Sequence, residues 1–122
     1  MDRAVRKEAF RKRTKTFASG IIRLYVALPK SREEVQVLGR QLIRAGTSVA
    51  ANYREASRAR TKADFISKIE TCAQEADEVQ LWLELLRDDC GIRSKLLGDL
   101  WQEADELISI FVTMARNAKE NK

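Results

Sequence analysis

The chain has 122 residues, 44% of them hydrophobic and 34% charged, which is typical of one folded domain and excludes a disordered chain. Histidine is absent, which excludes His-dependent nucleophile pairs and His-containing zinc and di-iron ligand sets. One proline, five glycines and two cysteines are too few for a turn-rich β fold or a disulfide scaffold. No signal peptide or membrane-spanning apolar run is evident. We therefore expect a cytoplasmic protein that is not an enzyme, needs no cofactor or metal, and has no membrane partner.

Apolar residues recur at steps of three and four in four stretches of the chain, which is the spacing of amphipathic helices. These stretches predict helices at about residues 3–28, 32–57, 62–90 and 93–118. Their connections are short, so successive helices must run antiparallel. The sequence predicts an all-α, up-down-up-down four-helix bundle that forms a single domain over residues 1–122. The residues expected to face its core are Phe10, Thr14, Phe17, Ile21, Leu24, Leu28, Val35, Leu38, Leu42, Ala45, Val49, Asn52, Phe65, Ile69, Cys72, Ala76, Val79, Leu83, Leu86, Leu97, Leu100, Ala104, Leu107, Phe111, Met114 and Ala118.

Start and stop signals bound these helices. Pro29 ends the first, because proline cannot continue a helix. Ser31 and Glu34 have the spacing of a capping box at the start of the second. Thr61 is placed to cap the third helix, and Gly91 to end it with a positive φ.

Four glycines fall inside the predicted helices, at Gly20, Gly39, Gly46 and Gly98. Each costs roughly 0.5–1 kcal/mol relative to alanine. Such a cost indicates positions where helices approach one another closely. A ligand cavity is the alternative interpretation, which we favour less.

A short internal repeat links the third and fourth helices. The sequence of residues 74–78, Gln-Glu-Ala-Asp-Glu, recurs at residues 102–106, an offset of 28 residues or four heptads. Equivalent carboxylates should therefore hold equivalent places on their helices. A carboxylate metal cluster is one interpretation, but without histidine ligands we favour two solvated acidic faces. The carboxylates concerned are Glu75, Glu78, Glu103 and Glu106.

Charge is distributed unevenly along the chain. Residues 1–29 carry 8 Lys/Arg and 2 Asp/Glu, and residues 30–62 carry 8 and 3, so these segments have net charges of +6 and +5. Residues 63–91 carry 2 and 8, a net charge of −6, and residues 92–122 are balanced. Cations near a helix N-terminus oppose the helix dipole, so helix stability does not explain those at the start of the chain. The cations in question are Arg3, Arg6, Lys7, Arg11, Lys12, Arg13 and Lys15 in the first helix, and Arg54, Arg58, Arg60 and Lys62 around the junction of the second and third helices.

These cations have three interpretations: contact with the phosphates of RNA or DNA, pairing with the acidic third helix within or between subunits, or a merely solubilising face. Arg3, Lys7, Arg11 and Lys15 follow an i, i+4 spacing and should form one stripe. Aromatic residues are not interleaved with the cations, so we do not expect sequence-specific recognition of single strands.

Several large apolar residues lie beside the predicted core stripes. Leu81 and Leu85 lie nearly opposite the core-facing side of the third helix, while Trp82 on that helix and Trp101 on the fourth helix widen the apolar surface. Exposed apolar patches mark interfaces, so we expect a homo-oligomer.

Two stretches resemble a known family. Residues 28–34, Leu-Pro-Lys-Ser-Arg-Glu-Glu, and residues 41–52, Gln-Leu-Ile-Arg-Ala-Gly-Thr-Ser-Val-Ala-Ala-Asn, are similar to the bacterial four-helix-bundle proteins encoded by intervening sequences of large-subunit ribosomal RNA genes. The resemblance covers about residues 15–115. It departs at residues 53–56, where this chain has Tyr-Arg-Glu-Ala and many relatives have Ile-Ala-Glu-Gly.

The resemblance implies an up-down bundle, a ring-shaped homo-oligomer that is commonly a pentamer, and no known enzymatic activity. A related group accompanies the reverse transcriptases of diversity-generating retroelements, where a basic ring contacts both the enzyme and nucleic acid. We interpret the motif residues as determinants of fold and assembly. Arg44 is expected to pair with Glu75 or Glu78, while Gln41, Ser48 and Asn52 are expected to hydrogen-bond at a helix crossing.

Two hypotheses of function follow from the sequence. In the first, a non-enzymatic homo-oligomer binds RNA or DNA through its basic half. In the second, the basic and acidic faces serve assembly, and the protein is a scaffold or an accessory subunit, for example of a reverse transcriptase.

Overall fold

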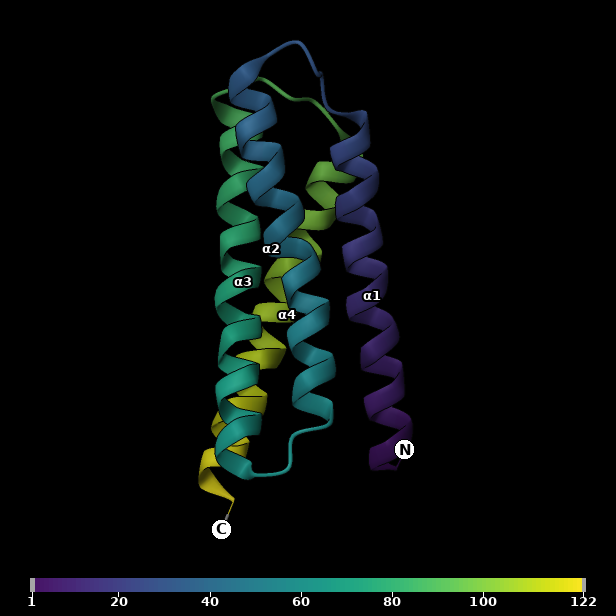
Figure 1. The fold of residues 1–122 in the computed structure, drawn as a ribbon, viewed down its shortest axis with the longest axis vertical. Helices are drawn as coiled ribbons and strands as arrows, with labels where there is room; N and C mark the ends of the chain where they lie inside the picture. The colour runs from purple at the N-terminus through teal and green to yellow at the C-terminus, as the bar shows by residue number, and fades with distance from the viewer. Residues whose placement is uncertain (1, 122) are drawn as a thin grey trace.

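Four long helices make up the structure, a computed structural model that describes residues 2–121. They are α1 (Arg3–Ala27), α2 (Glu33–Ser57), α3 (Lys62–Asp88) and α4 (Lys95–Glu120). Successive helices run in opposite directions (Figure 1). The predicted antiparallel four-helix bundle is confirmed, and each helix boundary lies within two residues of its predicted position.

Polar side chains cap three of the four helices. Asp2, Thr61 and Ser94 precede α1, α3 and α4, and each accepts a hydrogen bond from a backbone N–H in the first turn. The predicted cap at Thr61 is therefore confirmed.

The capping box predicted at Ser31 is wrong. Helix α2 begins one residue later than that box requires, so Arg32 occupies the cap position and provides no side-chain cap bond. The Arg32 guanidinium instead donates to the Glu34 carboxylate at 2.8 Å and to the Cys90 carbonyl at 2.9 Å. Glu34 is thus engaged by a side chain, and the α1–α2 connection is tied to the end of α3.

Helix α3 ends two residues earlier than predicted. Its cap is Asp89, and Gly91 then adopts a φ of 70°, the left-handed conformation that glycine tolerates. The backbone N–H of Ile92 bonds back to the carbonyl of Leu86 at 3.0 Å. The glycine therefore turns the chain toward α4, as its position in the sequence predicts.

The predicted core stripes meet along the axis of the bundle. Ile21, Leu42, Ile69, Leu83 and Phe111 are among the fully buried side chains. The stripe residues that are only half-buried gather mostly at one end, because the helices separate there. At that end they are Phe10, Asn52, Phe65, Met114 and Ala118.

Close approach explains three of the four helical glycines. A Cβ at Gly46 would lie 2.7–3.0 Å from Ile21, and one at Gly20 would lie 2.8 Å from Leu100. A Cβ at Gly39 would lie 3.1–3.3 Å from Leu28 and Tyr25. Gly98 differs, because a Cβ there would have no neighbour within 4 Å, and the prediction of close approach is wrong at that position.

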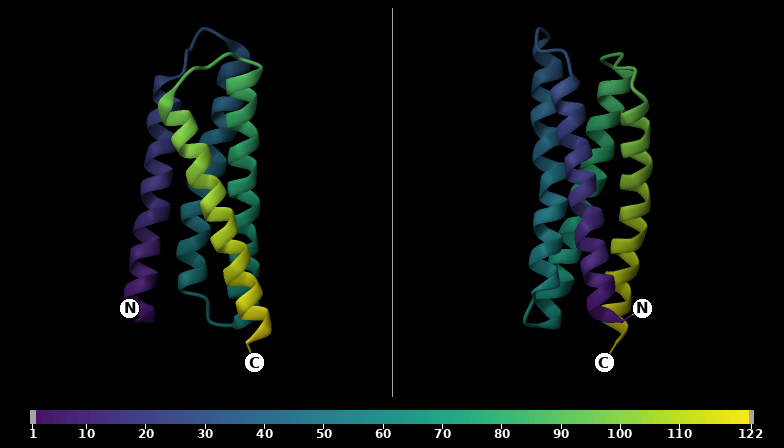
Figure 2. Two further views of the ribbon diagram at one scale, coloured as in Figure 1. Left: turned by 180° about the vertical axis from the view of Figure 1, so that it is seen from behind. Right: turned by 90° about the vertical axis from the view of Figure 1, so that its right-hand side faces the viewer.

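The helices do not pack evenly. Helix α2 lies between α1 and α3, and α3 packs on α4, whereas α1 and α4 have the least contact of the neighbouring pairs. Seen from behind, α1 and α4 approach at the end where α4 begins and diverge toward the opposite end (Figure 2). That opposite end holds the start of α1, the α2–α3 turn (residues 58–61) and the end of α4, and we call it the basic end.

Candidate nucleic-acid interface

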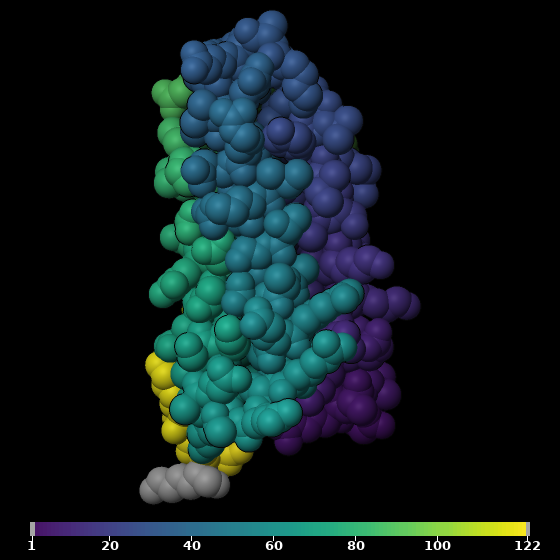
Figure 3. Space-filling model, in the orientation of Figure 1, coloured from purple at the N-terminus to yellow at the C-terminus, as the bar shows by residue number. Residues whose placement is uncertain are grey.

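The two groups of cations that lie far apart in the sequence meet at the basic end. Arg3, Arg6 and Lys7 belong to the first two turns of α1, and Arg58 and Arg60 belong to the α2–α3 turn. Side chains from the end of α2 and this turn stand out beside the start of α1 (Figure 3). The antiparallel order of α1 and α2 places both groups together, because the start of one helix lies beside the end of the next.

Most of these cations have no internal partner. Within residues 2–121, no ion pair engages Arg3, Arg6, Lys7, Lys12, Lys15, Arg54, Arg58 or Arg60, and all eight are exposed. Lys62 donates to the backbone carbonyl of Asn121 near the end of α4. Pairing with the acidic third helix, one of the three interpretations of these cations, therefore does not occur for these eight side chains within residues 2–121 of one subunit.

The predicted stripe along α1 divides into two parts. A step of four residues turns the helix by about 400°, so a run with this spacing drifts by about 120° over three steps. Arg3 and Lys7 consequently face the space between α1 and α4, whereas Arg11 is half-buried and lies 3.5 Å from Glu8. Lys15 is exposed.

Arg13 is committed to an ion pair that joins α1 to α4. Its Nε and Nη2 donate to the two carboxylate oxygens of Glu103, both at 2.8 Å, and Nη2 also lies 3.3 Å from Glu106. The hydrogen bonds that Arg13 donates to Glu103 raise the pKa of this arginine despite its partial burial. This arginine therefore has a structural role, unlike the eight exposed cations that no ion pair engages within residues 2–121.

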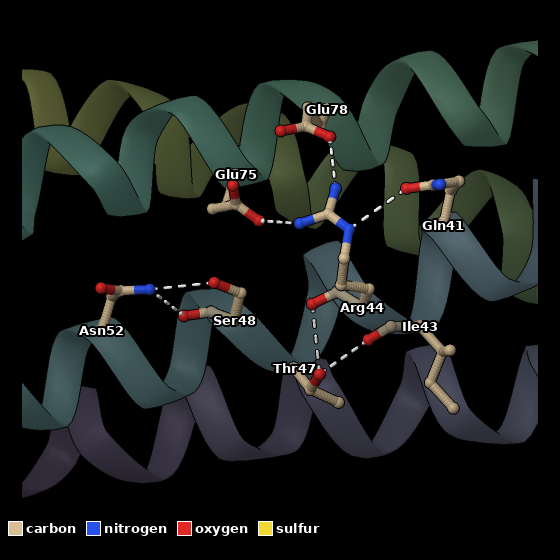
Figure 4. A network of polar contacts seen from close by, with 8 residues as sticks. All are labelled: Gln41, Ile43, Arg44, Thr47, Ser48, Asn52, Glu75 and Glu78. Carbon is tan, nitrogen blue, oxygen red and sulfur yellow. Dashed lines mark hydrogen bonds and ion pairs between the residues drawn. The ribbon is translucent and has the colours of Figure 1, made fainter.

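Arg44 makes the corresponding contact between α2 and α3 (Figure 4). Its Nη1 lies 3.0 Å from Glu75 and its Nη2 lies 2.5 Å from Glu78, while Nε donates to Gln41 at 3.1 Å. Partial desolvation lowers the pKa of Arg44, but the attraction of Glu75 and Glu78 outweighs it and the net shift is upward. The predicted pairing of Arg44 is confirmed with both glutamates.

The internal repeat thus supplies two equivalent ion-pair sites. Each copy presents two glutamates three residues apart, and each pair receives one arginine from the neighbouring helix. Among residues 2–121, no group of three or more Cys, Asp or Glu side chains is arranged to hold a metal ion. The acidic faces are therefore engaged by arginine, and not merely solvated as we predicted.

Three other motif residues bond within their own helix. Asn52 donates to the carbonyl and to the hydroxyl of Ser48, both at 2.9 Å, and Gln41 accepts from Arg44 of the same helix (Figure 4). The prediction that Gln41, Ser48 and Asn52 bond across a helix crossing is wrong for the single subunit. Asn52 lies four residues from Ser48, and Gln41 lies three residues from Arg44, so each reaches a partner within α2 before any neighbouring helix.

The residues predicted to serve assembly differ in exposure. Leu81 is 47% exposed, and Leu85 is half-buried. Trp82 and Trp101 pack partly against the core of their own subunit, and the Trp101 indole donates to Glu84 at 2.9 Å. Leu81 is therefore the most exposed side chain of this set, and only contact with another molecule would bury it.

A groove at the basic end is absent from the sequence-based prediction. It opens between the start of α1 and the end of α4 and brings aromatic side chains from three helices next to the cations. One signal points to it in retrospect. The core-facing positions of α1 continue from Phe10 toward the N-terminus through Lys7 and Arg3, which a closed bundle would have to bury.

Neither cysteine is placed as a nucleophile. Cys72 is fully buried between α2 and α3, and burial raises the pKa of its thiol to about 12. Its Sγ lies 3.7 Å from the carbonyl oxygen of Val49. Cys90 is buried beside the α3–α4 connection.

In the part of the chain that the structure describes, no helix has the length and apolar character needed to cross a membrane.

Fold and surface together define a small antiparallel four-helix bundle with one strongly basic end. Residues 6–113 match the family described as 23S rRNA-intervening sequence protein, and the chain belongs to this family. It is also similar to a crystal structure from Bacteroides thetaiotaomicron, described as a protein of unknown function from the S23 ribosomal protein family. That similarity has a TM-score of 0.78 and 31% identity, and it covers 86% of this chain and 96% of the other. Among curated proteins no match was found.

Proposed function

We propose that this protein binds RNA or DNA through its basic end, as a homo-oligomer without enzymatic activity. The observation that carries the proposal is the meeting of exposed cations from α1 and the α2–α3 turn at one end of the bundle. A nucleic-acid backbone presents a regular series of negative charges, and cations that neutralise them release bound counterions.

The position of these cations supports a role outside the fold. Arg3, Arg6 and Lys7 lie in the first two turns of α1, where a positive charge opposes the helix dipole. They gain no compensating ion pair within residues 2–121. A surface that costs stability and forms no internal contact is favoured as a binding surface for a polyanion.

The family description connects these proteins with an intervening sequence of 23S rRNA, so a 23S rRNA hairpin is the first RNA to test. The proposal concerns binding to phosphates, which is weakly selective for sequence.

Exposed apolar side chains support assembly. Among residues 2–121, six large apolar side chains are 42–68% exposed: Val5 and Val112 lie in the half of the bundle with the basic end, whereas Ile22, Val26, Val37 and Leu81 lie in the other half. Covering these last four with a second subunit would leave the cations of each copy accessible. Weak phosphate contacts would then add through multivalency, and a pentamer is the assembly that the family resemblance implies.

The binding proposal is tested by titrating a labelled 23S rRNA hairpin with the intact protein at increasing KCl. The double variant Arg3→Gln/Lys7→Gln should bind more weakly and reduce the slope of log K against log [salt] by about 0.7–0.9 for each phosphate that is no longer neutralised. The matched control is Arg23→Gln/Arg40→Gln, which removes two exposed cations from elsewhere on the bundle that form no ion pair within residues 2–121. Absence of binding to any RNA or DNA at low salt would contradict the proposal and favour the protein scaffold.

Assembly is tested separately by light scattering at micromolar concentration. The intact protein should have a mass of several subunits, and Leu81→Glu should lower that mass while helicity is retained. A mass of one subunit for the unaltered protein would contradict the oligomer.

A further inference from the structure

The groove at the basic end has an apolar floor and a basic rim. Its volume is about 490 Å³, within the range of small-ligand sites. Along α1 it extends from Arg3 to Arg13, a length of about 15 Å at the rise of an α-helix. The side chains that form its floor are Phe10, Tyr53, Phe65, Ile110 and Met114.

The groove exists because the inner face of α1 changes character. From Leu28 back to Phe10 this face is mostly apolar and packs in the core, but its next positions are Lys7 and Arg3. Burying these cations would carry a large desolvation penalty. Helix α4 instead diverges from α1 at this end (Figure 2), and the space between them stays open to solvent.

Three of the five floor residues are aromatic, and each comes from a different helix. Phe10 of α1 packs edge-on against Tyr53 of α2, with ring centroids 4.8 Å apart and an interplanar angle of 64°. Phe65 of α3 is half-buried beside them. Tyr53 is almost fully buried, so Phe10 and Phe65 are the aromatic side chains that a bound molecule can reach.

The rim of the groove is formed by one arginine that is held in an ion pair and by three exposed cations. Arg13 is held by Glu103, and its guanidinium lies 6.0 Å from the centre of the Phe10 ring, which closes the inner part of the groove. Arg3, Arg6 and Lys7 are exposed around the remainder. Residues three or four apart on a helix lie about 5–6 Å apart at Cβ, a spacing that suits neighbouring phosphates.

We propose that this groove holds unpaired nucleotides of the bound nucleic acid. The bases stack on Phe10 and Phe65, and the adjoining phosphates contact Arg3, Arg6 and Lys7. Base–aromatic stacking beside a basic track is how proteins bind single strands without reading sequence. The inference rests on the proposed function and adds to it a preference for single-stranded or bulged segments.

The surface beyond the groove favours a nucleic acid over an acidic peptide helix. Ser57 lines the groove, and the next residue, Arg58, begins the α2–α3 turn, where Arg60 is also exposed. The basic surface therefore continues past the end of the apolar floor. A polyanion that continues beyond its bound bases matches this arrangement, whereas a helix that fills a groove of about 15 Å would leave these cations unused.

The test compares two RNAs of equal length and charge, a perfect hairpin and the same hairpin with a two-nucleotide bulge in place of one base pair. The intact protein should bind the bulged RNA more tightly. Phe65→Leu keeps an apolar side chain but removes the aromatic face, and it should weaken bulged-RNA binding roughly five-fold or more. Binding of the perfect hairpin should change less than two-fold. Phe65→Tyr, which retains the ring, is the matched control.

A second measurement uses the unaltered protein, so it does not depend on the folding of any variant. Bulged RNA with 5-iodouridine in the bulge should photocrosslink to a peptide that contains Phe10 or Phe65. Crosslinks found only outside the groove would overturn the proposal.

Other outcomes separate this inference from the proposed function. Equal binding of both RNAs, with no effect of Phe65→Leu, would overturn the groove proposal and leave phosphate binding intact. Binding of neither RNA at low salt would overturn both. If Phe65→Leu abolishes binding of a synthetic acidic amphipathic peptide and leaves bulged-RNA binding unchanged, the groove belongs to a protein partner and the proposal is wrong.

Discussion

Helices α2 and α3 are joined by the same ion-pair arrangement as α1 and α4, yet the two pairs of helices pack differently. Arg44 reaches the two glutamates of one copy of the repeat, and Arg13 reaches those of the other. Helices α2 and α3 form the most extensive contact in the bundle, whereas α1 and α4 diverge toward the basic end. Because both pairs of helices carry an arginine paired with two glutamates, the ion pairs by themselves do not determine how closely the helices pack.

The side chains that face each other determine this difference. Between α2 and α3 the fully buried positions include the small residues Ala45, Cys72 and Ala76, which let two backbones approach. Between α1 and α4 the inner positions at the basic end are Lys7 and Arg3. Their charged groups must stay hydrated, because burying them would carry a large desolvation penalty. Close packing therefore requires apolar or small side chains on both helices, and ion pairs between partly exposed groups contribute little to it.

The largest expected effect comes from removing the same apolar side chain in the two regions. Ile69 on α3 is fully buried, and Ile110 on α4 is half-buried in the groove. Ile69→Ala should lower the free energy of unfolding by about 2–5 kcal/mol, because it leaves a cavity. Ile110→Ala should lower it by less than about 1 kcal/mol, because water already reaches that site. Urea unfolding at one fixed protein concentration measures both, and equal losses would show that the groove end is packed like the core.

Replacing Gly46 with alanine and replacing Gly98 with alanine should change the free energy of unfolding in opposite directions. A methyl group at Gly46 would lie 2.7–3.0 Å from three side-chain atoms of Ile21, including its Cβ, so Gly46→Ala should destabilise the protein by about 1–3 kcal/mol. Gly98 is exposed in α4 with open space around it, so Gly98→Ala should stabilise the protein by about 0.5–1 kcal/mol. Thermal melts followed by circular dichroism give both signs. A stabilising Gly46→Ala would show that α1 and α2 can separate at no cost in stability.

The smallest expected effect concerns the two arginines. Arg13 and Arg44 have side chains that are 35% and 49% exposed, so solvent screens both ion pairs. Replacing either with methionine should change the free energy of unfolding by no more than about 1 kcal/mol, and added salt should reduce the difference. Unfolding at low and high NaCl provides the measurement. A destabilisation well above that figure for Arg13→Met would mean that its pair with Glu103 holds α1 on α4.

Much of this architecture was predictable from local patterns. The spacing of apolar residues indicated the helices and most of the core, because a helix repeats every 3.6 residues wherever it packs. The equivalence of the glutamate pairs follows from an offset of four heptads, and the pairing of Arg44 was expected as the structural role of a motif residue in the family resemblance. The cap of α2 was not predictable in this way, since Arg32 bonds to the carbonyl of Cys90, 58 residues later in the chain.

The sequence by itself determined the helices, the core stripes and the concentration of positive charge in the first half of the chain. Only the tertiary structure decided that Arg13 pairs with Glu103 while Arg3 and Lys7 have no ion-pair partner among the described residues, and that Phe10, Tyr53 and Phe65 gather beside them. The physical reason is the range of the interactions involved. Helix periodicity and capping act within about one turn, whereas the divergence of α1 from α4 depends on which side chains from distant parts of the chain can share a dry interface.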